Sequence, residues 1–113
     1  MALEPHESVE MYQADDRLLQ FTIVGLADVT SVDDAQWDLY YRHTSYQVLV
    51  KTLGSGIALN SSTNTVDVTL DEADTELLEP AVYDGELRLR YTSGYSEIAA
   101  VGTITIKDRR VGE

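Results

Sequence analysis

Histidine, serine and aspartate are the residue types from which this sequence could build a hydrolytic site, and their spacing argues against one. The chain has two histidines, His6 and His43. Nucleophilic catalysis needs a nucleophile, a base and a group that orients the base. Ser45 lies too close to His43 along the chain to form such a pair, and no G-x-S-x-G elbow is present. We therefore expect no catalytic residues and a protein that is not an enzyme.

Carboxylates are abundant enough to raise the question of acid–base catalysis or metal binding. Adjacent pairs such as Asp15-Asp16 and Asp71-Glu72 diverge from each other, so they do not flank a sugar as the carboxylates of glycosidases do. Four aspartates gather in and after one loop, and oxygen ligands of this kind suit calcium: Asp28, Asp33, Asp34 and Asp38. Because the spacing of an EF-hand is absent, we expect no specific metal site and no cofactor.

The seven tyrosines are the residues best suited to binding another molecule, since tyrosine is amphipathic and enriched at interfaces. Tyr40 and Tyr41 are neighbours in a strand pattern, so one of them lies outside the core. Tyr91 and Tyr95 flank a turn at Ser93-Gly94. These tyrosines either close the ends of a β-sandwich or form a protein-binding rim, and we take Tyr40, Tyr91 and Tyr95 as candidate partner-binding residues.

The composition limits the classes of partner. The 113 residues suffice for one domain, and 20 acidic residues against 8 basic ones give a net charge of −12. A polyanion would be repelled by most of this surface, so we expect no nucleic-acid partner. The apolar runs are too short to span a membrane, and the absence of cysteine excludes disulfides and thiolate metal sites.

Lysine is scarce, because only Lys51 and Lys107 accompany the six arginines. Such a composition is typical of proteins from extreme halophiles, in which molar salt screens the repulsion between carboxylates. An ordinary acidic protein has a similar charge balance, and both interpretations stay open.

Polar and apolar residues alternate with a period of two in six segments from Arg17 onwards, which predicts β-strands. One short helical turn is expected after Asp71, a suitable N-cap, and before Pro80. Short strands in close succession predict an all-β fold, an antiparallel, immunoglobulin-like (Ig-like) β-sandwich. The alternation predicts a core of Leu19, Phe21, Ile23, Trp37, Leu39, Val48, Val50, Val66, Val68, Leu70, Leu87, Leu89, Ile104 and Ile106.

The domain organisation follows from the first and last alternating segments. We expect an extended N-terminal arm over residues 1–14, a sandwich over 15–108 and a polar tail over 109–113. The arm is more apolar than a solubilising tail requires, so it could become ordered on a partner. The candidate binding residues in it are Leu3, Val9, Met11 and Tyr12. A free end without a partner is the alternative.

The segment from Gly56 to Ile106 has a distinctive order of motifs. A Gly56-Ile57 hairpin precedes the strand Val66 to Leu70, an acidic turn follows up to Pro80, and a strand of x-L-x-L type and a closing G-x-I-x-I strand complete the segment. This order resembles a small β-sandwich domain of tailed viruses, found as the N-terminal domain of siphovirus baseplate upper proteins and in small virion proteins, and the resemblance covers residues 17–106.

The resemblance implies a non-enzymatic structural component of a tailed-virus particle, and the acidic composition suggests a halophilic, haloarchaeal host. The expected role is capsid decoration, or an accessory of the neck, tail or baseplate. The expected partners are capsid or tail subunits and further copies in a symmetric assembly. No secretory leader is visible, so we expect synthesis in the host cytoplasm and a final location in the virion. The alternative is a carbohydrate- or cell-surface-binding sandwich, since tyrosines can stack on sugars.

Overall fold

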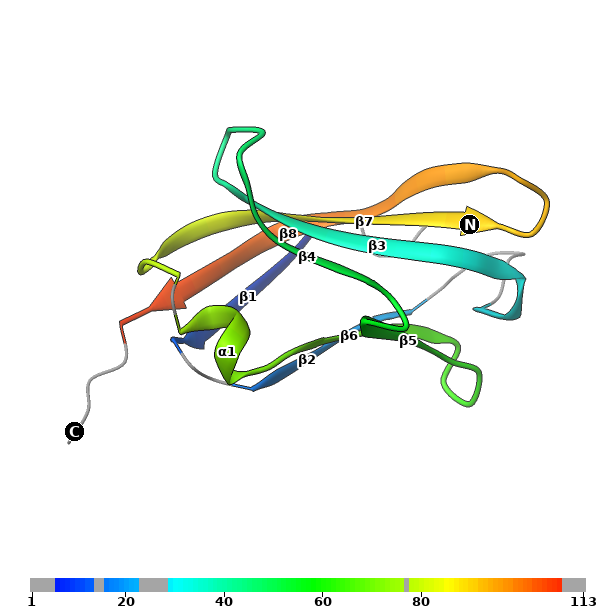
Figure 1. Cartoon of the computed structure of the whole chain (residues 1–113), viewed down its shortest axis with the longest axis horizontal. Helices are drawn as coiled ribbons and strands as arrows, with labels where there is room; N and C mark the ends of the chain where they lie inside the picture. Colours follow the sequence, from blue (N-terminus) through cyan, green and yellow to red (C-terminus); the bar gives the residue numbers. More distant parts are fainter. Residues whose placement is uncertain (1–5, 14–15, 23–28, 77, 109–113) are drawn as a thin grey trace.

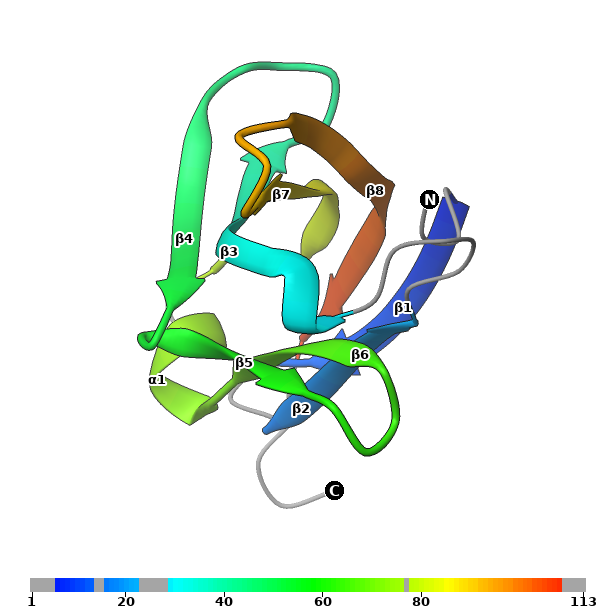
Figure 2. The same cartoon turned by 90° about the vertical axis from the view of Figure 1, so that its right-hand side faces the viewer.

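Two facing layers of β-strands make up the protein (Figures 1 and 2). The computed structural model describes residues 6–13, 16–22, 29–76 and 78–108. No helix in these ranges is long and apolar enough to cross a membrane. The elements in chain order are β1 (His6–Tyr12), β2 (Arg17–Thr22), a 3-10 turn (Val29–Ser31), β3 (Val32–Tyr41), β4 (Gln47–Leu53), β5 (Gly56–Asn60), β6 (Thr65–Leu70), α1 (Glu72–Thr75), β7 (Ala81–Tyr91) and β8 (Ser96–Lys107).

Hydrogen bonding connects the strands in the order β1-β8-β7-β3-β4-β5-β6-β2. The link between β4 and β5 consists of two residue pairs, Thr52 with Gly56 and Leu53 with Ile57. At this narrow link the sheet turns back on itself, so that β5, β6 and β2 face the layer of β1, β8, β7, β3 and β4 (Figure 2). The β1–β8 and β4–β5 pairings are parallel, and the others are antiparallel.

The core lies between the layers and follows the period-two alternation of the strands. Along β7, for example, Leu87 and Leu89 are buried while Arg88 and Arg90 are exposed. Phe21 and Val48 are half-buried against the core, and Ile23 lies outside the described residues. Burial is confirmed for Leu19, Trp37, Leu39, Val66, Val68, Leu70, Leu87, Leu89, Ile104 and Ile106.

The prediction for Val50 is wrong, because β4 presents the opposite face to the core. Val50 is 44% exposed. Lys51 pairs directly with the buried Trp37, so it lies on the inner side, and its ammonium binds the Asp74 carboxylate at 2.7 Å. The run Val48-Leu49-Val50 is apolar in both phases of the alternation, and therefore its hydrophobic pattern does not define the register.

The N-terminal segment is also corrected. Residues His6–Tyr12, expected within a free arm, form β1 and pair in parallel with Val101 to Lys107 of β8. Met11 is buried in the core, and Val9 packs against it. Pairing with β8 thus places Val9 and Met11 on the core side of this segment. Residues 1–5 and the tail over 109–113 lie outside the described residues.

The short helical turn after β6 begins where predicted. The Asp71 side chain accepts a hydrogen bond from the Asp74 backbone N–H, and the Asp74 carboxylate accepts one from the Asp71 N–H. This reciprocal capping box fixes the start of α1. The helix ends after one turn, at Thr75.

The start of β7 has one feature that is typical of Ig-like domains and one that departs from them. The buried Tyr83 donates its hydroxyl hydrogen to the Glu79 carbonyl oxygen at 2.6 Å, which forms a tyrosine corner. In antibody domains a cysteine follows two residues later and joins a disulfide that packs on a buried tryptophan. Here that position is Gly85, and a Cβ atom added to it would lie 3.2 Å from the Trp37 ring. Apolar packing around Trp37 therefore joins the layers where antibody domains have a disulfide.

A pair of valine truncations tests which residues of β4 face the core. Val68→Ala removes two methyl groups from a fully buried site, so we expect a loss of about 2 kcal/mol in the free energy of unfolding. The same truncation at the exposed Val50 should cost less than about 0.5 kcal/mol. Urea denaturation measures both. Equal losses in the free energy of unfolding would indicate that Val50 is buried, which would contradict the inward position of Lys51.

The tyrosine corner predicts a loss of stability in alkali. Burial, together with the nearby Tyr41 and Glu79, raises the pKa of Tyr83 above its ordinary value. As the pH rises, the Tyr83 hydroxyl therefore loses its proton at a lower pH in the unfolded chain than in the folded one. The stability that Tyr83 contributes is complete below a pH of about 10 and is lost as the pH rises through the folded pKa.

Thermal melting between a pH of about 8.5 and 11.5 measures this effect. Tyr83→Phe should lower the melting temperature at neutral pH, because the hydrogen bond is lost, and should flatten the alkaline decline. Tyr46→Phe is the control, because Tyr46 is exposed. An unchanged alkaline decline in Tyr83→Phe would exclude Tyr83 as its source.

Candidate functional site

The candidate site is the outer face, by which we mean the surface of β8, β7, β3 and β4 that points away from β5, β6 and β2. Strand pairing arranges its side chains in cross-strand rows. One row contains Val50, Asp38, Glu86 and Val101, and the next contains Thr52, Gln36, Arg88 and Ile98. A third row contains Gln47, Tyr40, Asp84 and Thr103.

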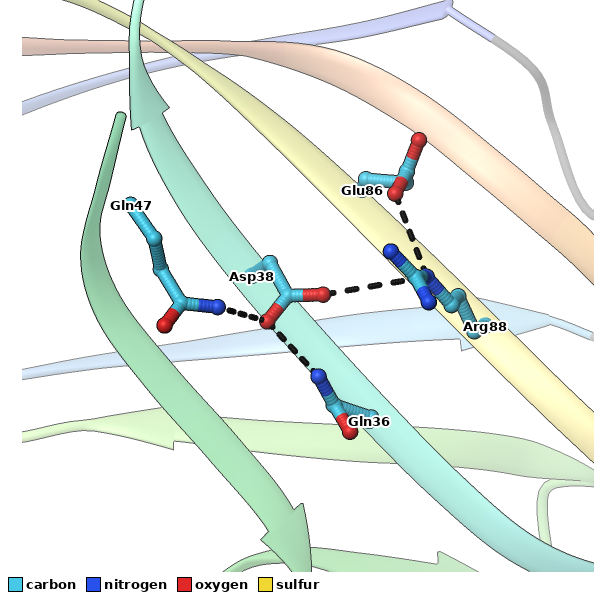
Figure 3. Close-up of polar contacts among 5 residues, drawn as sticks. All are labelled: Gln36, Asp38, Gln47, Glu86 and Arg88. Carbon is cyan, nitrogen blue, oxygen red and sulfur yellow. Dashed lines mark hydrogen bonds and ion pairs between the residues drawn. The ribbon is translucent and has the colours of Figure 1, made fainter. Parts of the chain in front are cut away.

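Asp38 lies at the centre of this face and is completely buried. Its Oδ1 atom accepts hydrogen bonds from Gln36 Nε2 at 2.9 Å and from Gln47 Nε2 at 2.6 Å (Figure 3). The two amides come from β3 and β4, so the carboxylate joins neighbouring strands beneath the surface. A buried carboxylate needs such donors, because its desolvation is costly.

The second carboxylate oxygen of Asp38 is less well satisfied. Asp38 Oδ2 is buried and has no hydrogen-bond partner in the described part of the chain. The Arg88 Nε atom lies 3.9 Å from it, and the same Nε donates to Glu86 Oε1 at 3.3 Å (Figure 3). One guanidinium is thus shared between two carboxylates.

The ionisation of the neighbouring residues reflects this arrangement. Burial and the negative charge of Asp38 raise the pKa of Tyr40, so its phenol stays protonated. A hydrogen bond with Glu86 and a weaker effect from a hydrogen bond with Tyr40 raise the pKa of Arg88, so its guanidinium stays charged. The outer face therefore presents a fixed phenol and a fixed cation.

Apolar side chains surround this polar centre and remain in contact with solvent. Ile98 is 58% exposed and Val101 is 37% exposed, and Val50 lies on the opposite side of Asp38. Arg88 keeps about half of its side chain exposed between them (53%). Tyrosine and arginine, supplied here by Tyr40 and Arg88, are enriched in the centres of protein interfaces.

A hollow of about 690 Å³ continues the outer face beneath the connection between β3 and β4, which projects from the body of the protein (Figure 1). One wall is the connection, from Arg42 to Ser45, and the floor includes Asp84, Glu86 and Thr103. The His43 N–H donates to Asp84 Oδ2 at 2.8 Å, which ties the connection to β7. Tyr40 also borders the hollow.

Of the candidate residues that lie within the described ranges, Tyr40 alone lies at this site. Tyr91 is buried, its hydroxyl donates to Glu97 Oε2 at 2.7 Å, and its ring stacks on that of Tyr95 at the β7–β8 turn. Met11 is buried as well, so Met11 and Tyr91 do not form a binding rim. Tyr12, beside the Lys107 ammonium, and Tyr95 are exposed but lie in other parts of the protein.

Of the two further candidates from the arm, the structure describes only Val9. Val9 is half-buried on the inner side of β1, and Leu3 lies outside the described residues. The residues that the sequence interpretation missed as a binding group are Asp38, Glu86, Arg88, Ile98 and Val101. The outward positions of Glu86 and Arg88 follow from the alternation in β7, but their meeting with Asp38 required the pairing of β3 with β7.

The loop aspartates have separate roles. Asp33 binds Arg90 at 3.0 Å, and Asp34 accepts a hydrogen bond from the Ala35 N–H. Asp28 lies outside the described residues. Within the ranges that the structure describes, no three histidine or acidic side chains are grouped so that they could hold a metal ion.

Comparison with known proteins identifies the fold. The chain is similar to CopC from Methylosinus trichosporium OB3b, with 14% identity and a TM-score of 0.52, over 96% of this chain and 88% of CopC. It is also similar to a chicken TCR, with 10% identity and a TM-score of 0.64, over 98% of this chain and 58% of the TCR chain. The chain is an Ig-like β-sandwich.

The predicted fold class is thus confirmed. No protein-family model matches the sequence, and no curated protein matches it significantly. In contrast, 247 solved chains match the structure, a breadth that is typical of a widely used fold. Such a fold does not determine a function, which has to be argued from the outer face itself.

Replacing Asp38 tests whether its carboxylate organises the outer face. Asp38→Ala leaves the amides of Gln36 and Gln47 without their acceptor, so we expect a loss of about 1–3 kcal/mol in the free energy of unfolding. Asp38→Asn retains one carbonyl acceptor and should lose less. Asp33→Asn, which breaks an exposed ion pair, is the control and should change stability by less than about 1 kcal/mol. If Asp38→Ala is as stable as the control, the network has no structural role.

Proposed function

We propose that this chain is a non-enzymatic, protein-binding component of a tailed-virus particle, where it serves as capsid decoration or as a neck, tail or baseplate accessory. The observation that carries the proposal is the outer face, where exposed Ile98 and Val101 lie on β8, beside Arg88 and Glu86 of β7, and exposed Val50 lies on β4, on the other side of Asp38. A repetitive particle offers many equivalent surfaces to such a module, so several copies would bind in a symmetric assembly. The chain would be made in the host cytoplasm and reside in the virion.

The arrangement of the outer face supports a binding role rather than a purely structural one. Water contacts aliphatic side chains in neighbouring rows, and burying them against a partner is favourable. The polar centre is already ordered by the contacts of Asp38 with Gln36 and Gln47, so binding orders few additional groups. The resemblance of residues 17–106 to virion domains supports the choice of partner.

A second candidate function is the binding of carbohydrate in the hollow. Tyr40 borders the hollow together with Asp84 and Glu86, and sugars bind to aromatic rings and carboxylates. A glycan-array signal that Tyr40→Ala abolishes would favour this function over particle binding.

The proposed function predicts that a charge on the outer face blocks attachment to the particle. Ile98→Asp places a carboxylate among exposed apolar residues, and we expect affinity for the assembled particle to fall at least about tenfold. Leu18→Asp is the matched control, because Leu18 is exposed to a similar degree (52%) on β2, in the other layer. Both variants should fold, since neither site is buried.

The measurement is mass spectrometry of purified particles, followed by competition between the variants and the natural chain for binding sites. Absence of the natural chain from the particles would contradict the proposed function. Equal incorporation of Ile98→Asp and the natural chain would show that the outer face is not the attachment surface.

A further inference from the structure

We propose that the hollow of the outer face receives a basic side chain, an arginine or a lysine, from the protein that this chain binds. This inference rests on the proposed function as a binding module and names the chemistry of its partner. The cation would pair with Glu86 and Asp84 and would lie against Tyr40. Its alkyl part would contact Val101.

The first argument is a shortage of positive charge at the centre of the outer face. Asp38 and Glu86 are paired across β3 and β7, and Arg88 serves both carboxylates. Arg88 Nε is closer to Glu86, at 3.3 Å, than to Asp38, at 3.9 Å. The completely buried Asp38 Oδ2 therefore stays without a hydrogen bond. A second cation at Glu86 would release Arg88 to move toward Asp38 and satisfy the buried oxygen.

The second argument is the shape and lining of the hollow. Its volume, about 690 Å³, is ample for a long side chain and the backbone that carries it. Asp84 and Glu86 each use one oxygen in the contacts described above, which leaves the other oxygen to accept a hydrogen bond from a cation. The Tyr40 ring and the Val101 side chain can cover the alkyl part of an arginine or a lysine.

The charges that face the hollow favour a cation over an anion. Besides the two carboxylates, the ionisable side chains of the lining are Arg42, His43 and the Tyr40 phenol. Arg42 Nε donates to His43 Nε2 at 3.1 Å, so these two side chains are paired on the wall formed by the connection. Buried Asp38 adds negative charge next to the floor. An acidic group in this place would meet the carboxylates of Asp84 and Glu86, with that of Asp38 buried nearby.

The charge of the whole chain acts in the same direction. A net charge of −12 repels acidic partners and accelerates the approach of basic ones. A basic partner surface would thus be attracted at long range and positioned by one side chain in the hollow at short range.

The test is a titration of the full-length, ¹⁵N-labelled chain with arginine blocked as N-acetylarginine methylamide, followed by NMR. We expect weak, saturable binding that shifts the amide signals of Glu86, Val101 and Thr103. The matched probe is N-acetylcitrulline methylamide, which has nearly the same shape but no charge. It should bind at least about tenfold more weakly, because charge-assisted hydrogen bonds are lost.

Two variants separate the hollow from the overall charge. Glu86→Gln removes a carboxylate from the hollow and should weaken binding of blocked arginine at least about fivefold. Glu72→Gln removes the same charge from α1 and should leave binding unchanged, since Glu72 does not line the hollow. Thermal melting of both variants verifies that they are folded.

Four results would overturn the inference: no binding of blocked arginine, equal binding of blocked citrulline, equal weakening by the two variants, or signal changes confined to another surface. They can be distinguished from a failure of the proposed function. If blocked arginine does not bind while Ile98→Asp still loses attachment to the particle, the proposed function is supported and the inference of a basic side chain in the hollow is wrong. If blocked arginine binds while the chain is absent from particles, the inference of a cation-binding hollow is supported and the proposed viral role is wrong.

Discussion

Packing of the inner faces of two β-layers around Trp37 is the interaction on which the rest of the structure depends. The chain has no cysteine, so no covalent bridge joins the layers. The buried Tyr83 and Leu87 from β7, together with Val66 and Val68 from β6, supply the apolar contact area. Because neighbouring residues of a strand point to opposite sides, locking the inner side chains also determines which side chains face outward.

The outer face is a direct consequence of this constraint. Once Trp37 and Leu39 point inward, Asp38 between them must point outward, and pairing with β7 places it beside Glu86. The surrounding side chains then cover it, so a carboxylate on the outer side of the sheet becomes completely buried. The contacts of Gln36 and Gln47 compensate part of the cost, and Arg88 is held at the surface between two carboxylates. This ordered, partly apolar surface is the basis of the proposed binding function.

The N-terminal segment shows how topology changes the meaning of an apolar sequence. Val9 and Met11 were interpreted as groups that await a partner, and in the fold their partner is β8 of the same chain. A short amphipathic segment has the same pattern whether it covers its own sheet edge or that of another subunit. The parallel pairing with β8 therefore buries Met11 and half-buries Val9, while Tyr12 stays exposed on the edge strand.

The sequence by itself determined the strand class, most of the core and the start of α1, because these depend on local alternation and on one capping side chain. It also determined the exclusions that follow from composition, such as the lack of disulfides. It did not determine the phase of β4, where Val48-Leu49-Val50 is apolar in both registers, nor the pairing of His6–Tyr12 with β8. The grouping of Asp38 with Glu86 and Arg88 was equally hidden, since these residues lie about 50 positions apart and meet only through the pairing of β3 with β7. Burial of Asp38 and the shape of the hollow depend on side chains from four strands and one connection, and only the tertiary structure could decide them.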